Sequence, residues 1–529
     1  MVNDIRAHLR LTSLTAAILA AACAPATPGG LVLHGLALAE GGVDCSEGPH
    51  PISTTDVAKL HLAMTHAELD SFETSVSIEP ASRSVSLPEV PAGENWDLRL
   101  TGFISESAYQ AGTYTWLGRR RELNISANQS TGAGVLLLAV EAMQCSRTPL
   151  GEPVMLSKAT PLADGRVLIS GGVERFSAGD CPDCRWGIAT RNCTIYDPAT
   201  GSFQAAAPLP NARVGHSATL LDDGRVLVLG GSNRVRLGAA TSIDFDGAGL
   251  RDTALIWDPS ADRWLETEAP WGKRAFHSVT RVAPSVYAAV GGFADGQRVH
   301  ADLIRFHVEN DALRMDEAVE LACPRVGHQA FANAGDLIIW GGSRCADGEQ
   351  VAPEHWGPRL GLRVSRAERW GSEANLSFGT AVELRAGTFM ILGGATYRDG
   401  QLQAPNRENS YYYLAGSQSH VRAAMLPEGS QGLLGSALRL DSGQRVLLAG
   451  GFADLALNRP LSAYTFFNDD NESFSAASEL PGIGGALSIA PAGENQALLV
   501  GGGRVCEGCD GGLEPLTGGL IFASAKDHR

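Results

Sequence analysis

Short apolar runs of strand length recur along this chain, and seven of them end at a pair of glycines. The first glycines of these pairs are Gly171, Gly230, Gly291, Gly341, Gly393, Gly450 and Gly501. Successive pairs stand 50 to 61 residues apart. Continuous apolar runs are typical of strands that are buried on both faces. The pattern therefore predicts a repeated β unit over residues 146–529.

Two turn signals accompany the glycine pairs. Asp-Gly, as in Asp164–Gly165, precedes several of the apolar runs and is typical of tight hairpins. Asp-Pro, at Asp197–Pro198 and Asp258–Pro259, follows the glycines and leads to an aromatic residue. Each unit is therefore predicted to hold two strands around Asp-Gly, a variable loop after Gly-Gly, and two strands around Asp-Pro.

The series Asp-Gly-Arg-Val-Leu-Ile/Val-x-Gly-Gly followed by Tyr/Trp-Asp-Pro resembles the kelch repeat of bacterial secreted proteins. The resemblance covers roughly residues 150–529 and implies four-stranded blades. Stacking such blades around an axis buries their apolar faces and leaves only short edges. We therefore expect a seven-bladed kelch-type β-propeller over residues 146–529. The last repeat lacks a fourth strand, and we expect residues 144–154 to supply it and close the ring.

Residues 43–145 lack the glycine-pair repeat. Strand-like apolar patterns occur at residues 59–64, 75–78, 96–100 and 135–140, with turn formers between them. Short strands of this kind predict a small β-sandwich in front of the propeller, and an all-β chain. The stretch at residues 87–100 resembles the immunoglobulin-like modules of bacterial surface proteins.

Residues 1–39 have the pattern of a targeting segment, in which basic residues precede an apolar stretch at residues 11–24. Two processing routes stay open. In the first, a lipobox-like stretch ends at Cys23, which is lipidated after cleavage. In the second, cleavage follows the Ala-Leu-Ala pattern of residues 37–39. We therefore expect an exported protein, either an outer-membrane lipoprotein or a periplasmic or secreted one.

The charge of the chain excludes one class of partner. Acidic residues number 58 and basic residues 42, so the formal net charge is −16, which argues against a basic nucleic-acid groove. Contact with a membrane is expected only through a lipid anchor. No phosphate loop, nucleophile elbow or zinc-protease helix occurs, so we expect no cofactor and assign no catalytic residue.

Nine cysteines follow Cys23, and export favours disulfides among them. They are Cys45, Cys145, Cys181, Cys184, Cys193, Cys323, Cys345, Cys506 and Cys509. Cys45 and Cys145 bracket the N-terminal domain. Cys323 and Cys345 stand at equal distances from a predicted hairpin turn, so they face each other across an antiparallel pair.

The remaining five cysteines follow the glycine pairs of the first and last repeats, which closure of the ring makes neighbours. Disulfides are the preferred interpretation, and the odd number implies one free thiol or an intermolecular link. The alternative is a metal site, since Cys181, Cys184, Cys506 and Cys509 form two Cys-x-x-Cys pairs with zinc-knuckle spacing.

Three repeats open with an Arg-x-x-His pattern. Its members are Arg213 and His216, Arg274 and His277, and Arg325 and His328. The kelch resemblance places them at the start of the innermost strand, toward the central channel. The preferred interpretation is that they form hydrogen bonds between blades. The alternative is a cationic ring around the channel that holds a carboxylate ligand.

The expected function is that of a binding or interaction protein whose ligand is a protein or a glycan. The alternative is a carbohydrate-active enzyme, epimerase-like or oxidase-like, with its site in the axial funnel. Copper-radical oxidases with kelch propellers need a Tyr-His pair, and no Tyr-His dipeptide occurs here. A funnel with converging carboxylates and arginines favours the enzyme. A funnel of serine, glycine and apolar side chains favours binding.

Overall fold

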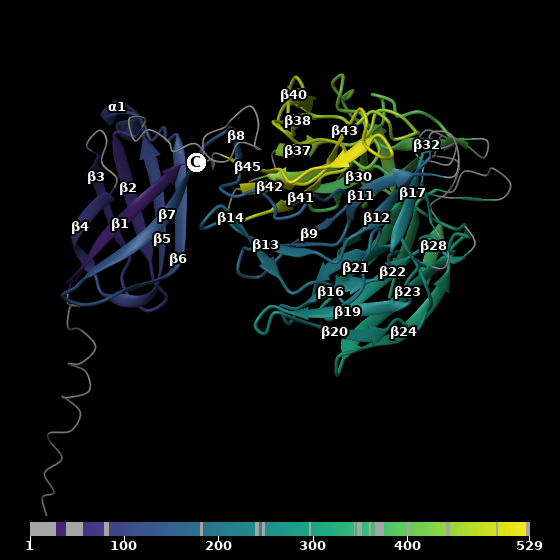
Figure 1. Cartoon of the computed structure of the whole chain (residues 1–529), viewed down its shortest axis with the longest axis horizontal. Helices are drawn as coiled ribbons and strands as arrows, with labels where there is room; N and C mark the ends of the chain where they lie inside the picture. Colours follow the sequence, from purple (N-terminus) through teal and green to yellow (C-terminus); the bar gives the residue numbers. More distant parts are fainter. Residues whose placement is uncertain are drawn as a thin grey trace, which may run out of the picture. The chain divides into compact units, whose positions relative to one another are not determined.

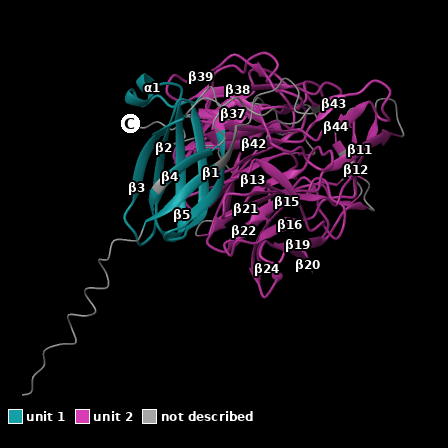
Figure 2. Cartoon of the chain, turned by 60° about the vertical axis from the view of Figure 1, so that its left-hand side comes forward, with its two compact units in different colours: residues 1–38, 52–137 teal, residues 39–51, 138–529 magenta. Residues whose placement is uncertain are grey.

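The structure is a computed structural model, and its cartoon is shown in Figure 1. It describes residues 28–38, 57–78, 84–179, 184–238, 243–245, 249–295, 298–342, 344–345, 352–358, 361–364, 375–398, 401–440, 445–493 and 496–524. The chain divides into two compact units, coloured separately in Figure 2. One unit comprises residues 1–38 and 52–137, and the other residues 39–51 and 138–529.

The N-terminal unit is a seven-stranded sheet with one short helix. Its elements are β1 (Pro28–Leu38), β2 (Lys59–Thr65), β3 (Phe72–Ser77), β4 (Ser84–Pro91), β5 (Gly93–Phe103), α1 (Glu106–Gln110), β6 (Trp116–Ile125) and β7 (Ser130–Ala139). The strand order is β3-β2-β5-β6-β7-β1-β4, so hydrogen bonds join all seven strands into one sheet. Leu60, Leu62 and Met64 alternate with more exposed residues along β2, and all three are buried. This alternation is typical of a sheet with one face on the core.

Strand β1 lies inside the segment that the sequence assigned to targeting. It pairs in parallel with β7 and antiparallel with β4, so it is an interior strand of the sheet. Leu31 and Leu33 of β1 are fully buried. The expectation that residues 1–39 lie outside the fold is therefore wrong for residues 28–38.

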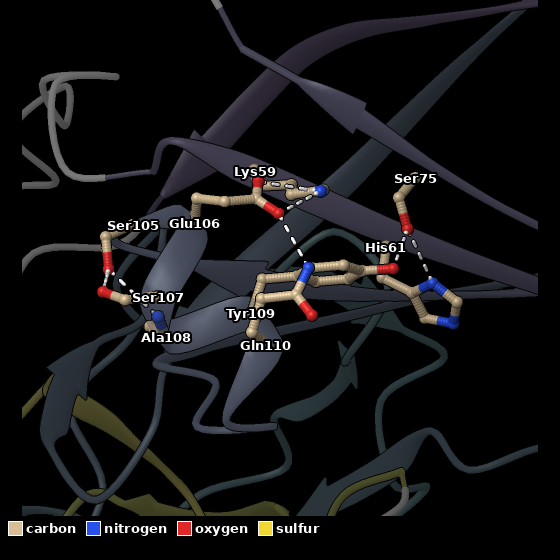
Figure 3. A network of polar contacts seen from close by, with 9 residues as sticks. All are labelled: Lys59, His61, Ser75, Ser105, Glu106, Ser107, Ala108, Tyr109 and Gln110. Carbon is tan, nitrogen blue, oxygen red and sulfur yellow. Dashed lines mark hydrogen bonds and ion pairs between the residues drawn. The ribbon is translucent and has the colours of Figure 1, made fainter.

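A polar network attaches helix α1 to the sheet (Figure 3). Lys59 of β2 forms an ion pair of 2.8 Å with Glu106 of α1, and its ammonium lies 3.8 Å from the centre of the Tyr109 ring. The Tyr109 hydroxyl lies 2.8 Å from the Ser75 hydroxyl, which lies 3.0 Å from Nδ1 of His61. The hydrogen bond from Lys59 lowers the pKa of Glu106. These contacts order a helix that is too short to be stable alone.

The larger unit contains seven sheets that share one strand arrangement, counted over the described residues. Their inner strands are β9 (Lys158–Pro161), β15 (Ser217–Leu220), β21 (Ser278–Ala283), β25 (Gln329–Asn333), β30 (Thr380–Arg385), β36 (Ser436–Leu440) and β41 (Ser488–Pro491). The second strands are β10 (Val167–Ser170), β16 (Val226–Leu229), β22 (Val286–Val290), β26 (Asp336–Trp340), β31 (Thr388–Leu392), β37 (Arg445–Ala449) and β42 (Gln496–Val500).

The outer half of each sheet follows the same order. The third strands are β13 (Cys193–Asp197), β19 (Thr253–Asp258), β23 (Asp302–Glu309), β27 (Glu354–Gly357), β34 (Ser410–Leu414), β38 (Ala463–Asn468) and β45 (Gly519–Ala523). The outermost strands are β14 (Ser202–Ala206), β20 (Arg263–Glu268), β24 (Ala312–Glu320), β28 (Gly361–Val364), β35 (Ser419–Arg422), β39 (Ser473–Phe474) and β8 (Met143–Cys145). A further strand, β40 (Ser478–Glu479), pairs with β38.

The sheets form a closed ring. Strand β9 of the first sheet neighbours both β15 of the second and β41 of the last. Strand β8 completes the last sheet, since Cys145 pairs with Leu520 of β45 in antiparallel register. A latch strand just before the first repeat is therefore confirmed, but it is Met143–Cys145 and shares only Gln144 and Cys145 with the predicted residues 144–154. An all-β propeller is the fold class that the sequence predicted.

Apolar side chains of neighbouring sheets share common cores. Leu168 and Cys193 of the first sheet belong to one buried cluster with Val226 and Val228 of the second. All four residues of the second strand β16 are buried, as the continuous apolar run predicts. A single sheet leaves these faces in water, so the ring is the arrangement that buries them.

Loops that follow the glycine pairs build small sheets of their own, which the sequence did not predict. Strands β11 (Val173–Ala178) and β12 (Arg185–Ala189) come from the first such loop. They join β17 (Arg234–Leu237) and β18 (Ile243–Phe245) of the second loop in a four-stranded sheet, which we call the loop sheet. Other strands of such loops are β32 (Ala395–Arg398), β33 (Gln401–Leu402), β43 (Gly503–Val505) and β44 (Leu513–Pro515), and β32 also pairs with β29 (Leu376–Ser377), which precedes the inner strand β30. Within the described residues, no helix is both long and apolar enough to cross a membrane.

Candidate functional site

An axial cavity of about 400 Å³ is lined by residues from all seven sheets. Most of its lining residues belong to the first positions of the inner strands or to the segments just before them. They are mainly serine, threonine, glycine and apolar residues. Lys158 and three histidines are the lining residues that can carry a positive charge, and the described lining includes neither a carboxylate nor an arginine.

The register of the sheets defines one equivalent position around this cavity. It is the first residue of each inner strand, and it pairs with the residue just before the Gly-Gly of its own repeat. The seven equivalent residues are Lys158, Ser217, Ser278, Gln329, Thr380, Ser436 and Ser488. Hydroxyl residues fill five of these positions and an amide fills a sixth, so Lys158 is the exception.

Side chains at this position form hydrogen bonds to the next sheet around the ring. The Ser217 hydroxyl lies 3.0 Å from Nε2 of His277, and the Ser278 hydroxyl lies 2.8 Å from Nε2 of His328. Gln329 donates to the carbonyl of Gly379 at 2.7 Å. At the closure of the ring, Ser488 donates to the Ser157 carbonyl at 2.6 Å, and Ser436 donates to the Leu487 carbonyl at 2.9 Å. This inter-blade ladder aligns neighbouring sheets.

The three histidines are buried members of this ladder and are neutral. His216 is 1% exposed, and its Nε2 lies 3.3 Å from the Ser170 hydroxyl. Burial lowers the pKa of His216 and of His328 to about 3, and it lowers the pKa of His277 well below its usual value. Neutral imidazoles do not attract an anion by charge, so these side chains do not form a cationic ring.

An apolar layer borders the cavity. Leu156, Phe276, Phe378 and Leu434 belong to it, and all four have positive φ angles between 53° and 59°. Such a backbone is strained for large side chains. Backbone hydrogen bonds between sheets support it: the amide of Phe378 donates to the Gly327 carbonyl at 2.7 Å, and the amide of Leu434 donates to the Phe378 carbonyl at 2.8 Å.

The three candidate arginines lie away from the axial cavity and are fully buried. Each donates from its NH1 group to the first glycine of its own Gly-Gly pair: Arg213 to Gly230, Arg274 to Gly291, and Arg325 to Gly341. They therefore fix the turn that follows the second strand. The alternative of a cationic ring with these arginines is wrong, because they lie outside the cavity lining and bond backbone carbonyls and side chains of their own sheets.

The further partners of the three arginines differ from sheet to sheet, and only two of them are carboxylates. Arg213 bonds the carbonyl and hydroxyl of Thr253, and burial lowers its pKa to about 10. Arg274 forms an ion pair of 3.1 Å with Asp302, whose side chain is 28% exposed. Arg325 forms an ion pair of 2.7 Å with Glu354, and both side chains are 0% exposed. Burial lowers the pKa of Arg325 although Glu354 opposes that shift.

The cysteines are mostly disulfide-bonded. Cys323 is joined to Cys345, and Cys506 is joined to Cys509. Cys145 and Cys184 are also in disulfides, whereas Cys23, Cys45 and Cys181 lie outside the described residues. Zinc binds thiolates, so sulfurs that are held in disulfides do not support the metal site proposed for the two Cys-x-x-Cys pairs.

Cys193 is the free thiol among the described cysteines. It is buried, and desolvation raises the pKa of its thiol to about 12. A buried thiol with a raised pKa is unreactive. The group Cys506, Cys509 and Glu514 brings three metal-ligating residue types together, but the first two are oxidised to a disulfide.

No protein-family model matches the chain. Among curated proteins, it is similar to Kelch-like protein 13 and Kelch-like protein 9 of Mus musculus, each 25% identical over 162 residues, or 30% of this chain. The match spans 22% and 23% of these relatives, so the chain covers less than a quarter of their length. Among solved structures, it is similar to a fungal alcohol oxidase of the AA5 family in complex with copper. That likeness has a TM-score of 0.51 and 15% identity, and it covers 72% of this chain and 76% of the other.

The fold is a kelch-type β-propeller. The match to the oxidase structure supports the fold alone at this identity. Lys158 was not predicted as a site residue, because the first repeat lacks the Arg-x-x-His pattern and Lys158 belongs to no motif of its own. One signal could have indicated it: the chain has only four lysines, and one of them opens the first inner strand.

Proposed function

We propose that this protein is an exported binding protein that uses its propeller as a rigid scaffold for a protein or glycan ligand. The observation that carries the proposal is the axial lining of serine, glycine and apolar side chains, free of carboxylates among the described residues. General acid–base chemistry on a sugar needs positioned groups such as a carboxylate pair. The relatives named Kelch-like proteins are in keeping with a scaffold of this kind.

The loop sheet is the surface that we propose for the ligand. Trp186 of β12 is half-buried, and the guanidinium of Arg234 lies 4.4 Å from the centre of its ring. Arg236 of the same strand lies 5.9 Å from that ring. Aromatic and arginine side chains on ordered loops are typical of recognition surfaces. The inner face of this sheet is apolar and packs on the propeller through Val235 and Leu237.

An oxidase-like function is the weaker alternative. Of the described residues, the only cluster of three metal-ligating side chains contains the bonded cysteines Cys506 and Cys509. Tyr413 and His355 form a buried hydrogen bond of 2.6 Å. Neither residue lines the axial cavity, and Tyr413 belongs to an apolar core between sheets.

The proposal includes export and a lipid anchor on Cys23. Cleavage after Ala39 removes β1, and with it the pairing of β1 with β4 and with β7 in the N-terminal sheet. Processing before Pro28 keeps that strand, which supports the lipobox route. Intact-mass measurement of the membrane-extracted protein tests this step. The expected mature chain begins at an acylated Cys23, and a mature chain that begins at Glu40 overturns it.

Glycan arrays and pull-down experiments with the purified protein test the ligand proposal. A sugar-mutarotation assay on the same protein tests the enzyme alternative. We expect a retained ligand whose binding weakens in Trp186→Ala. The matched control is Met315→Ala, which removes an apolar side chain that is 50% exposed on the outermost strand β24. Mutarotase activity, or ligand binding that both variants reduce equally, contradicts the proposal.

A further inference from the structure

We propose that the axial cavity is a binding site for a small oxyanion, a carboxylate or a phosphate, held by Lys158. This inference does not depend on the ligand of the loop sheet. It starts from the equivalent position defined by the sheet register, where six sheets have an uncharged polar residue and the first has Lys158.

Lys158 does not take part in the inter-blade ladder. By the pattern of the next two sheets, the residue at this position bonds the histidine of the following sheet. In the first sheet Ser170 bonds His216 instead. Ser170 pairs directly with Lys158 across strands β9 and β10, so it replaces the missing hydroxyl from the neighbouring strand. The hydrogen bond to the histidine of the next sheet is therefore made by Ser170 and does not need Lys158.

The amine of Lys158 has no hydrogen-bond or ion-pair partner among the described residues, and its side chain reaches the solvent of the cavity. Lys158 is exposed to the cavity, and desolvation by the neighbouring groups lowers the pKa of its amine. The described lining offers no carboxylate, so the positive charge of Lys158 is one that an anionic ligand can balance.

The remaining lining suits an oxyanion. The hydroxyl of Thr380 comes from another sheet and can donate to a carboxylate or phosphate oxygen, whereas the hydroxyls of Ser278 and Thr280 already bond His328 and the Ala330 carbonyl. The neutral histidines neither repel nor neutralise the anion. Phe276 and Phe378 border the same space with apolar surface, which suits the carbon skeleton of an organic acid.

Isothermal titration calorimetry on the full-length protein at neutral pH tests the proposal. The probes are glucuronate, inorganic phosphate, and glucose as the uncharged match to glucuronate. We expect saturable binding of at least one oxyanion and no binding of glucose. The probe that binds more tightly shows whether the site prefers a carboxylate or a phosphate. Loss of a charge-assisted contact predicts a weakening of about tenfold or more in Lys158→Ser. Lys158→Arg keeps the charge and retains binding.

Lys273→Ser is the matched control, since Lys273 lies outside the cavity and faces Asp295 at 3.9 Å. It leaves the affinity unchanged. If Lys158→Ser does not fold, the test uses the unsubstituted protein, and mass spectrometry measures the rate at which each lysine is acylated with and without the oxyanion. The bound oxyanion then slows labelling of Lys158 relative to Lys273. Unaltered affinity in Lys158→Ser, labelling without protection, or no binding of either oxyanion at millimolar concentration overturns the proposal.

Discussion

Replacement of Arg325 by methionine tests whether the buried arginines are structural. The guanidinium donates to Glu354 from two nitrogens at 2.7 and 2.8 Å, to Gly341 at 2.6 Å and to Ala352 at 3.1 Å. Arg325→Met leaves a carboxylate that is 0% exposed without its counter-charge. Breaking a buried ion pair from one side costs about 3–5 kcal/mol, and we expect a loss of stability in that range.

The double variant Arg325→Met/Glu354→Gln separates the charge from the packing. The glutamine carbonyl still accepts the amide hydrogen of Ala322, which Glu354 binds at 2.9 Å. No uncompensated charge remains, so we expect the double variant to be about 1–3 kcal/mol more stable than Arg325→Met. Urea unfolding followed by tryptophan fluorescence measures both, since Trp340 and Trp356 are buried in the propeller.

Arg274→Met is the matched control. Its partner Asp302 is 28% exposed, so water hydrates the carboxylate that remains and the loss is smaller than in Arg325→Met. A loss below about 1 kcal/mol in Arg325→Met, or a double variant no more stable than the single one, refutes the assignment. Oxyanion binding that disappears in a folded Arg325→Met would likewise show that this arginine acts on a ligand.

Two further predictions concern the axis of the propeller. Gly215 has a φ of 70°, and a Cβ there lies 2.7 Å from the Phe276 ring, so Gly215→Ala loses about 2–4 kcal/mol. The matched control is Gly224→Ala, which has a φ of 84° and open space around the added Cβ, so it loses only about 1–2 kcal/mol of stability. Equal urea midpoints for the two variants contradict the argument that crowding at Phe276 adds to the loss. The unfolded chain binds protons on His216 and His328 below about pH 6.5, but the folded protein does so only near pH 3. Stability is therefore full above pH 6.5 and falls toward pH 3. Urea midpoints of His328→Gln should fall less steeply, and parallel slopes refute the assignment.

The strands of the propeller were predictable because each carries a local signal. The run Val226–Leu229 is apolar on both faces, and the Gly-Gly at Gly230 marks its end, so pattern and structure agree. The latch was predictable from topology, since an incomplete last sheet needs a strand from elsewhere. Loop strands such as β11 and β12 carry no comparable signal, because their pairing with β17 depends on the ring that brings two loops together.

Two errors have physical causes. Strand β1 lies inside the predicted targeting segment because one of the two processing routes places the cleavage after the Ala-Leu-Ala pattern of residues 37–39. Arg325 was considered as a channel residue because sequence position places it near the axis. The backbone turn directs its side chain to the Gly341 carbonyl instead. The rarity of lysine singles out Lys158 in the sequence, but its place among the seven equivalent residues depends on a register that only the paired strands reveal.

The latch between β8 and β45 has a consequence for biogenesis. The two partners are made at opposite ends of the propeller unit, so the ring stays open until its last strand has been synthesised. Throughout that interval the first and last sheets have unsatisfied edges, which are prone to pair with other chains. A chain of this design therefore benefits from staying unfolded until its synthesis is complete, and chaperones that shield strand edges should raise its yield.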